Sequence, residues 1–170
     1  MKTFLIISLL PFLAISPLGV KSSGRNPRPD GPATRYEYQV SGMMRYPITF
    51  YEVDRDSTGT VRIAWSTSNE ADIRVIKGPD DFFQRVDGYV AQYKLHKLKS
   101  HYTPRMQVLD GEMWHAYIRF AKNSISTGGS NASAPRELMA GISAINQYIQ
   151  SLIDASSEAD VIGVRSHDDR

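Results

Sequence analysis

The segment from Leu109 to Pro135 constrains the fold more than any other part of the chain, because it combines a strand, a chain reversal and a helix start. In its first part, apolar residues alternate with polar or mixed ones, which makes one face of a strand apolar and leaves the other mixed. The apolar row is Trp114, Ala116, Ile118 and Phe120, and the mixed row is Met113, His115, Tyr117 and Arg119. The alternation predicts a strand that is buried on one face only.

A hairpin and a helix are expected directly after this strand. Lys122 and Asn123 interrupt the alternation where the chain would reverse, and residues 124–127 fit a short polar returning strand. Two glycines and several cap-forming residues then precede Pro135, which is favoured in the first turn of a helix. The helix is predicted over residues 135–153, with an apolar stripe made by Leu138, Ile142, Ile145, Ile149 and Leu152.

Three short motifs stand out here: a tryptophan in the strand, an Ile-x-Phe-Ala strand end, and a Gly-Gly-Ser-Asn-Ala-x-x-Pro helix entry. Their residues are Trp114, Ile118, Phe120, Ala121, Gly128, Gly129, Ser130, Asn131, Ala132 and Pro135. With these motifs, the second half of the chain resembles a group of small secreted bacterial proteins of unknown function. The turn departs from the pattern, since Lys122-Asn123 stands where an Asp-Gly type pair is more usual. The resemblance implies a secreted α+β domain and brings no catalytic residues.

Residues 1–22 have the features of a cleaved signal peptide. Lys2 precedes an apolar run from Phe4 to Ile15, and small residues follow around positions 19–24. A membrane anchor is the alternative, but the run is shorter than the ~20 apolar residues that span a bilayer. We therefore expect an exported protein, periplasmic or extracellular, with no stable membrane insertion after signal removal.

The chain contains no cysteine, so an exported domain of this sequence must be held together by an apolar core rather than by disulfides. That favours a single domain over residues 35–154. The proline-rich segment 23–34 is expected to be a flexible linker, and the mostly polar residues 155–170 a disordered tail.

The charge balance argues against a nucleic-acid partner. The chain has 20 Lys and Arg and 18 Asp and Glu, and removing Lys2 and Lys21 with the signal leaves 18 of each. The mature chain is thus formally neutral, whereas a domain that binds nucleic acid typically carries a basic surface.

The first half of the chain predicts four strands and a helix. The strands are expected over residues 36–40, 48–53, 61–65 and 71–77, separated by turn residues. In the second, Phe50 and Tyr51 lie on opposite faces although both are apolar, which requires a bulge or burial on both faces. An amphipathic helix should follow over residues 79–98. Basic residues at its end suit either an anion patch or the negative end of the helix dipole, and the dipole explanation is preferred; they are Lys94, Lys97 and Lys99, with His96 and His101 nearby.

Together these elements predict an α+β fold with two layers: a mainly antiparallel sheet of about six strands with two helices on one face, in the order ββββ-α-ββ-α. The opposite face of the sheet would then meet solvent. Arg and Tyr are enriched at binding hot spots, so this face is a candidate surface for an unknown protein or for an anionic or glycan ligand. The alternative is an ordinary solvated face with cross-strand pairs to acidic neighbours such as Glu37. The residues placed there are Arg62, Arg74, His115, Tyr117 and Arg119.

A small hydrolase-like enzyme is the second functional hypothesis, with a site near Asp110, His115 and the Gly128-Gly129 loop. Strand geometry opposes it, because Glu112 and His115 are an odd number of residues apart and should face opposite sides. We assign no catalytic residue. No metal-ligand spacing such as His-x-x-x-His is present, so no metal or other cofactor is predicted.

The glycine-rich loop is a separate candidate for anion binding, because backbone N–H groups ahead of a helix can hold a phosphate or carboxylate. Its residues are Gly128, Gly129, Ser130 and Asn131. The Lys-Ser/Thr ending of a phosphate-binding loop is missing, and a glycine-rich turn that only joins a strand to a helix is the simpler explanation.

The signal sequence yields the first testable prediction. The mature N-terminus should lie between Gly19 and Arg25, because the cleavage zone follows the short apolar run. N-terminal sequencing of the exported protein measures this directly. A mature, membrane-embedded protein that begins at Met1 would contradict it.

Overall fold

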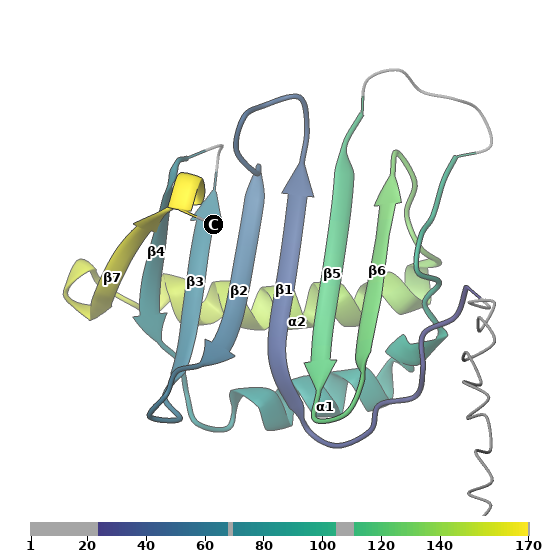
Figure 1. Cartoon of the computed structure of the whole chain (residues 1–170), viewed down its shortest axis with the longest axis horizontal. Helices are drawn as coiled ribbons and strands as arrows, with labels where there is room; N and C mark the ends of the chain where they lie inside the picture. The colour runs from purple at the N-terminus through teal and green to yellow at the C-terminus, as the bar shows by residue number, and fades with distance from the viewer. Residues whose placement is uncertain (1–23, 68–69, 105–110, 170) are drawn as a thin grey trace, which may run out of the picture.

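A computed structural model describes residues 24–67, 70–104 and 111–169. These residues form one seven-stranded antiparallel sheet with two helices packed on one face (Figure 1). The strands are β1 (Ala33–Ser41), β2 (Thr49–Arg55), β3 (Val61–Thr67), β4 (Asp72–Lys77), β5 (Met113–Phe120), β6 (Ser124–Ser130) and β7 (Val161–Ser166). The helices are α1 (Phe82–Gln92) and α2 (Arg136–Asp154), with short 3-10 helices η1 (Leu95–Lys97), η2 (Glu158–Asp160) and η3 (His167–Asp169).

The strand order across the sheet is β6-β5-β1-β2-β3-β4-β7. Strand β1 pairs with β2 on one side and with β5 on the other, and Tyr36 lies opposite Ile118 in the β1–β5 register. The predicted α+β fold class is confirmed, with a seventh strand added at the end to give ββββ-α-ββ-α-β. The predicted hairpin is also present, because the amide of Phe120 donates to the carbonyl of Asn123 at 2.8 Å.

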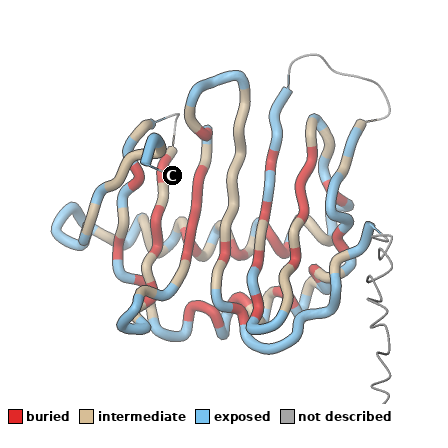
Figure 2. Tube along the Cα trace, in the orientation of Figure 1, coloured by how far each residue is buried: buried red, intermediate tan, exposed pale blue. Residues whose placement is uncertain are grey.

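The main core lies between the sheet and the two helices. The apolar row predicted for β5 is buried, and buried residues of both helices contact the same cluster (Figure 2). Trp65 of β3 packs against this cluster but is only partly buried. The helix-side members of the core are Phe82, Phe83, Val86, Val90, Ile142, Ile145 and Ile149.

The last strand corrects the prediction of a disordered tail over residues 155–170. Strand β7 pairs with the outer edge of β4, and the amide of His167 continues the attachment by donating to the carbonyl of Ala71 at 2.9 Å. The sequence pattern does not predict this strand, because two of its three apolar residues, Ile162 and Val164, are 59% and 61% exposed, and only Val161 packs against the main core. Pairing of backbone groups at a sheet edge holds it instead.

The segment before β1 corrects the prediction of a flexible linker over residues 23–34. The chain is extended, as its prolines suggest, but it is attached along the outer edge of β6. The Asn26 side chain donates to the carbonyl of Leu98 and accepts from the amide of Ser126, both at 2.9 Å. Strand β1 begins at Ala33, inside the predicted linker. An edge strand has unpaired backbone N–H and C=O groups, and this segment provides a hydrogen-bond partner for one of those of β6.

The helix predicted over residues 79–98 is shorter than expected, because α1 ends at Gln92. Lys94 then adopts a left-handed conformation with φ of 54°, which breaks the helix before η1. Helix α2 agrees with its prediction to within one residue at each end. No helix in the described ranges is both long enough and apolar enough to cross a membrane.

Trp114 provides a test of the core. Its ring is 8% exposed and its indole N–H donates to the carbonyl of Ala132 at 2.7 Å. Trp114→Ala should lower the free energy of unfolding by roughly 3–5 kcal/mol, the range for a large aromatic removed from a core. Trp65→Ala is the matched control and should cause a smaller loss, because Trp65 is only partly buried. Denaturant unfolding measures both, and equal losses would contradict this account of the core.

Candidate functional site

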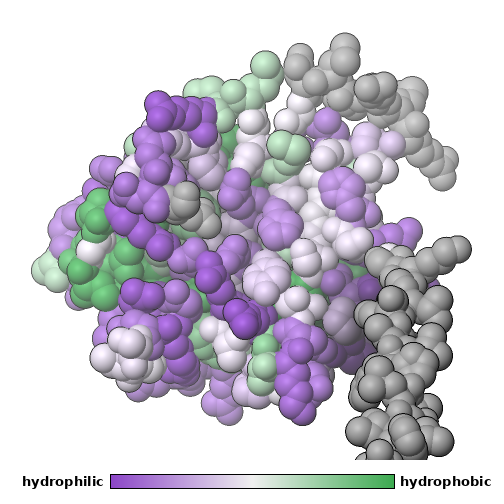
Figure 3. Space-filling view, in the orientation of Figure 1, coloured by the Kyte–Doolittle hydropathy of each residue, from purple (hydrophilic) through white to green (hydrophobic). Residues whose placement is uncertain are grey.

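The face of the sheet opposite the helices, here called the open face, carries most of the predicted binding residues. Figure 3 views this face: hydrophilic and neutral side chains cover its middle, and apolar ones gather toward β4 and β7. His115, Tyr117 and Arg119 alternate with the buried row of β5 and therefore lie on the open face, as predicted. Arg62 lies there too, where it contacts Asp54.

Arg74 lies on the other face of the sheet, which corrects the sequence assignment. It pairs in register with Trp65, whose side chain packs against the main core, and its guanidinium contacts Glu158 near η2. The neighbouring Ile73 takes the open face instead and is fully buried there. The sequence could not decide between the two faces of β4, because apolar residues occur on both.

A second, smaller apolar cluster divides the open face. It consists of Phe50, Ala64 and Ile73, with Val75 packed against it. The His167 ring of η3 meets the Phe50 ring edge-on, with centroids 5.1 Å apart. On the helix-covered face of β2, the Tyr51 hydroxyl donates to Gln150 of α2 at 2.8 Å. Burial on both faces therefore explains the ambiguous pattern of residues 48–53.

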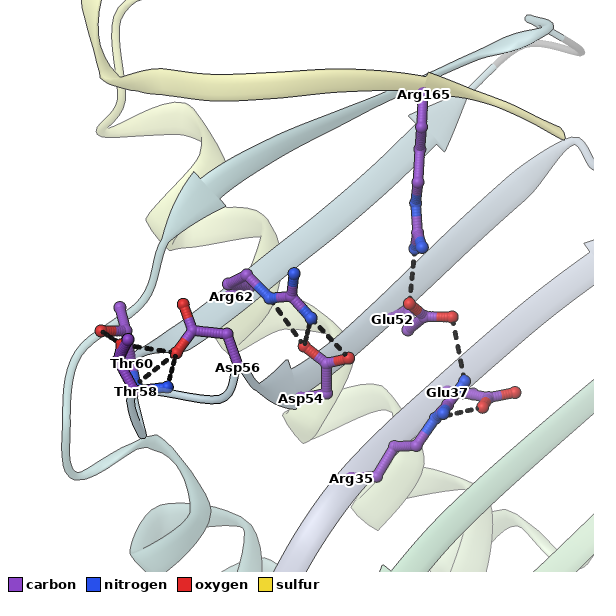
Figure 4. A network of polar contacts seen from close by, with 9 residues as sticks. All are labelled: Arg35, Glu37, Glu52, Asp54, Asp56, Thr58, Thr60, Arg62 and Arg165. Carbon is purple, nitrogen blue, oxygen red and sulfur yellow. Dashed lines mark hydrogen bonds and ion pairs between the residues drawn. The ribbon is translucent and has the colours of Figure 1, made fainter. Parts of the chain in front are cut away.

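Beside this cluster, a network of charged side chains crosses the open face (Figure 4). Glu52 is only 5% exposed, and its carboxylate accepts from Arg35 at 3.1 Å and from Arg165 of β7 at 2.5 Å. Arg35 also contacts Glu37 at 2.5 Å. A buried carboxylate is costly unless it is paired, and two guanidinium groups meet that need here. This half of the open face is therefore neutralised by its own residues.

The half formed by β5 and β6 is different. Within the described residues, the Arg119 guanidinium has no ion-pair partner and the Tyr117 hydroxyl has no hydrogen-bond partner. The His115 ring nitrogen Nε2 lies 3.1 Å from the Ser126 hydroxyl. Alternate residues of a strand are about 7 Å apart, so these three side chains form a polar row along β5, in which His115 contacts Ser126 while Tyr117 and Arg119 have no side-chain partner among the described residues.

A shallow pocket of about 290 Å³ adjoins the His115 end of this row. Its lining includes two imidazoles, His101 and His115, together with the Gln39 amide, the Met113 side chain and the backbone at Gly128. None of the described lining residues carries a carboxylate. We call the row of His115, Tyr117 and Arg119 together with this pocket the β5 strip.

The predicted anion loop is not a loop, because Gly128 to Ser130 form the end of β6. The amide of Ser130 donates to the carbonyl of Tyr102 at 3.2 Å, and the amide of Asn131 to that of Glu112 at 2.9 Å. These two N–H groups are therefore already used. Gly129 is needed for a different reason, since a Cβ there would lie 2.6 Å from the indole nitrogen of Trp114. The backbone carbonyl oxygen of Ala132 is nearer still, so close packing of the ring and of this carbonyl explains the glycine.

The structure brings together part of the predicted hydrolase-like site, because His115, Gly128 and Gly129 line the same pocket. Asp110 lies outside the described residues. Burial raises the pKa of Tyr38, which packs against the main core, and the negative charge of Glu112 adds to the rise. His115 lies on the open face of β5. Among the residues that the structure describes, no three His, Asp or Glu side chains cluster closely enough to hold a metal ion.

The sequence matches no protein-family model and no curated protein. Functional reasoning therefore rests on the geometry of the β5 strip. Sequence reasoning found the row on β5 but missed the network around Glu52. The available signal was a carboxylate in the middle of the apolar strand over residues 48–53, since such a charge needs a partner when it is buried.

The Glu52 network generates a prediction about stability. Arg165→Ala should lower the free energy of unfolding by about 1–3 kcal/mol, because Glu52 would remain buried with one guanidinium fewer. Arg62→Ala is the control on the same face; its pair with Asp54 is more exposed and should contribute at most about 1 kcal/mol. Urea unfolding of the two variants gives the comparison. An Arg165 effect no larger than the Arg62 effect would show that Glu52 does not depend on β7.

Proposed function

We propose that this protein is an exported, non-catalytic binding module that takes an extended anionic glycan along the β5 strip. The observation that supports the proposal is the contrast within one face of the sheet. The half near β7 pairs its charges internally, whereas the β5 strip leaves a guanidinium and a phenol without partners among the described residues. Export is inferred from the signal-like residues 1–22.

The three side chains suit a glycan that carries carboxylate or sulfate groups. The planar guanidinium of Arg119 presents paired N–H donors that match a carboxylate. Tyr117 offers a ring face for packing and a hydroxyl for hydrogen bonding. His115, with Ser126 beside it, supplies a further polar contact at the pocket. The spacing of about 7 Å between alternate strand residues lets one elongated ligand reach all three groups.

The hydrolase-like alternative gains one element, the contact between the Ser126 hydroxyl and His115 Nε2. A serine nucleophile also needs a group that orients the histidine and donors that stabilise an oxyanion. The pocket lining described here offers His115 no carboxylate, and the pocket is shallow. Binding needs only His115, Tyr117 and Arg119 and no further group, and we therefore prefer it.

The proposal is tested with Tyr117→Ala combined with Arg119→Ala. The double variant should lose about tenfold or more in affinity for an acidic glycan, as expected when hot-spot residues are truncated. Binding is measured on an array of acidic and neutral glycans, with thermal unfolding as the check on folding. Wild-type binding should also weaken as salt is added, because exposed charges are screened.

Arg74→Ala is the matched control, because Arg74 lies in the same sheet but on the opposite face, next to Glu158. It should bind acidic glycans as the wild type does. Wild-type protein that binds no acidic glycan, or a folded double variant that still binds one, would overturn the proposal.

A further inference from the structure

A cluster of basic residues lies outside the open face, where the segment before β1 runs beside η1 next to the β6 edge (Figure 1). A pocket of about 510 Å³ is lined there by Arg25, Asn26, Arg28, His96, Lys97 and Lys99. We propose that this basic pocket binds a small, multiply charged phosphate-class anion, such as a pyrophosphate group. The site is separate from the β5 strip, and the proposal does not depend on the proposed function.

Two segments that are far apart in sequence build the basic pocket. Arg25 forms a bridge with Lys99, and the amide of Ser100 donates to the carbonyl of Gly24 at 3.3 Å. Asn26 holds the arrangement in place, because its side chain bonds both to Leu98 and to Ser126 of β6. Arg25 and Arg28 are thereby held beside Lys97 and Lys99.

The charges of the basic pocket are not neutralised by the protein. Within the described residues, no ion pair involves any of its four Lys and Arg side chains, and its lining contains no carboxylate. The pKa of His96 is lowered, first by burial and then by the nearby charges of Arg28, Lys97 and Lys94. Lys122, by contrast, lies 3.5 Å from Asp30. The basic pocket is therefore a concentration of unpaired positive charge.

The dipole of α1 does not explain this concentration. Helix α1 ends at Gln92 and holds no basic residue in its last turn. The dipole effect falls off within one turn, whereas Lys97 and Lys99 lie further along the chain. Arg25 and Arg28 come from a different segment altogether. The structure thus removes the explanation that the sequence alone favoured for the basic residues after the helix.

The geometry points to a phosphate-class ligand. Arginine matches the oxygens of phosphate with paired N–H donors, and lysine adds a compact charge. Four cations suit a ligand with several negative charges better than a single carboxylate. The arginine and lysine side chains belong to exposed residues, so a free anion can reach them from solution.

Calorimetric titration of the purified protein with pyrophosphate and with inorganic phosphate tests this site. Pyrophosphate should bind more tightly than phosphate. Arg28→Ala combined with Lys97→Ala should weaken pyrophosphate binding by about tenfold or more, because two charge-assisted contacts are lost. Both residues are exposed, so the fold should be retained; Lys97→Glu alone is a second variant that should weaken binding.

Two control variants show whether the loss of pyrophosphate binding arises at the basic pocket. Lys122→Ala removes a lysine that already has Asp30 as a partner, and it should leave pyrophosphate binding unchanged. Tyr117→Ala with Arg119→Ala should also leave it unchanged, which separates this site from the β5 strip. The ring resonances of His96 should shift on titration. Absence of pyrophosphate binding, equal loss in the Lys122 control, or wild-type binding by the variant that combines Arg28→Ala with Lys97→Ala would overturn the proposal.

Discussion

Burial of β2 on both of its faces is the constraint on which the rest of this structure depends. Tyr51 and Val53 face the helices, whereas Phe50 lies on the other side of the sheet, which neither α1 nor α2 covers. Strand β7 and η3 are positioned at that side, and the His167 ring packs against Phe50. The carboxylate of Glu52, beside them, then requires Arg165 from β7 as well as Arg35. The two-sided burial of β2 therefore accounts for the attachment of β7 and η3 to the sheet.

The same constraint explains why the two proposed binding surfaces lie away from β7. In the half of the open face near β7, the apolar residues are covered and the charged side chains are paired with one another. Few groups there remain available for contact with a partner. The β5 strip is beyond the reach of β7 and keeps its donors exposed. The basic pocket lies at the opposite edge of the sheet, beside β6. It forms because the segment before β1, which is attached to β6, places two arginines next to Lys97 and Lys99.

The sequence was sufficient for features that depend on local periodicity and insufficient for features that depend on distant partners. The alternation of residues 113–120 predicted the buried face of β5, and the spacing in α2 predicted its extent. Arg74 was placed on the wrong face, because β4 has apolar residues on both sides. Strand β7 was missed because its stability comes from the edge of β4 and from Glu52. Gly129 suggested a turn, although it lies in β6 and makes room for the Ala132 carbonyl and the Trp114 ring.

The position of β1 has a consequence for the order of folding. One neighbour, β2, follows at once in the chain, whereas the other, β5, is about 70 to 90 residues away. Closing so long a loop is entropically unfavourable before contacts form, so the β1–β4 meander and the β5–β6 hairpin should assemble separately and then join. A ligand touching both Gln39 and His115 would span that junction. Such a ligand would therefore slow unfolding by slowing the separation of the β1–β4 meander from the β5–β6 hairpin.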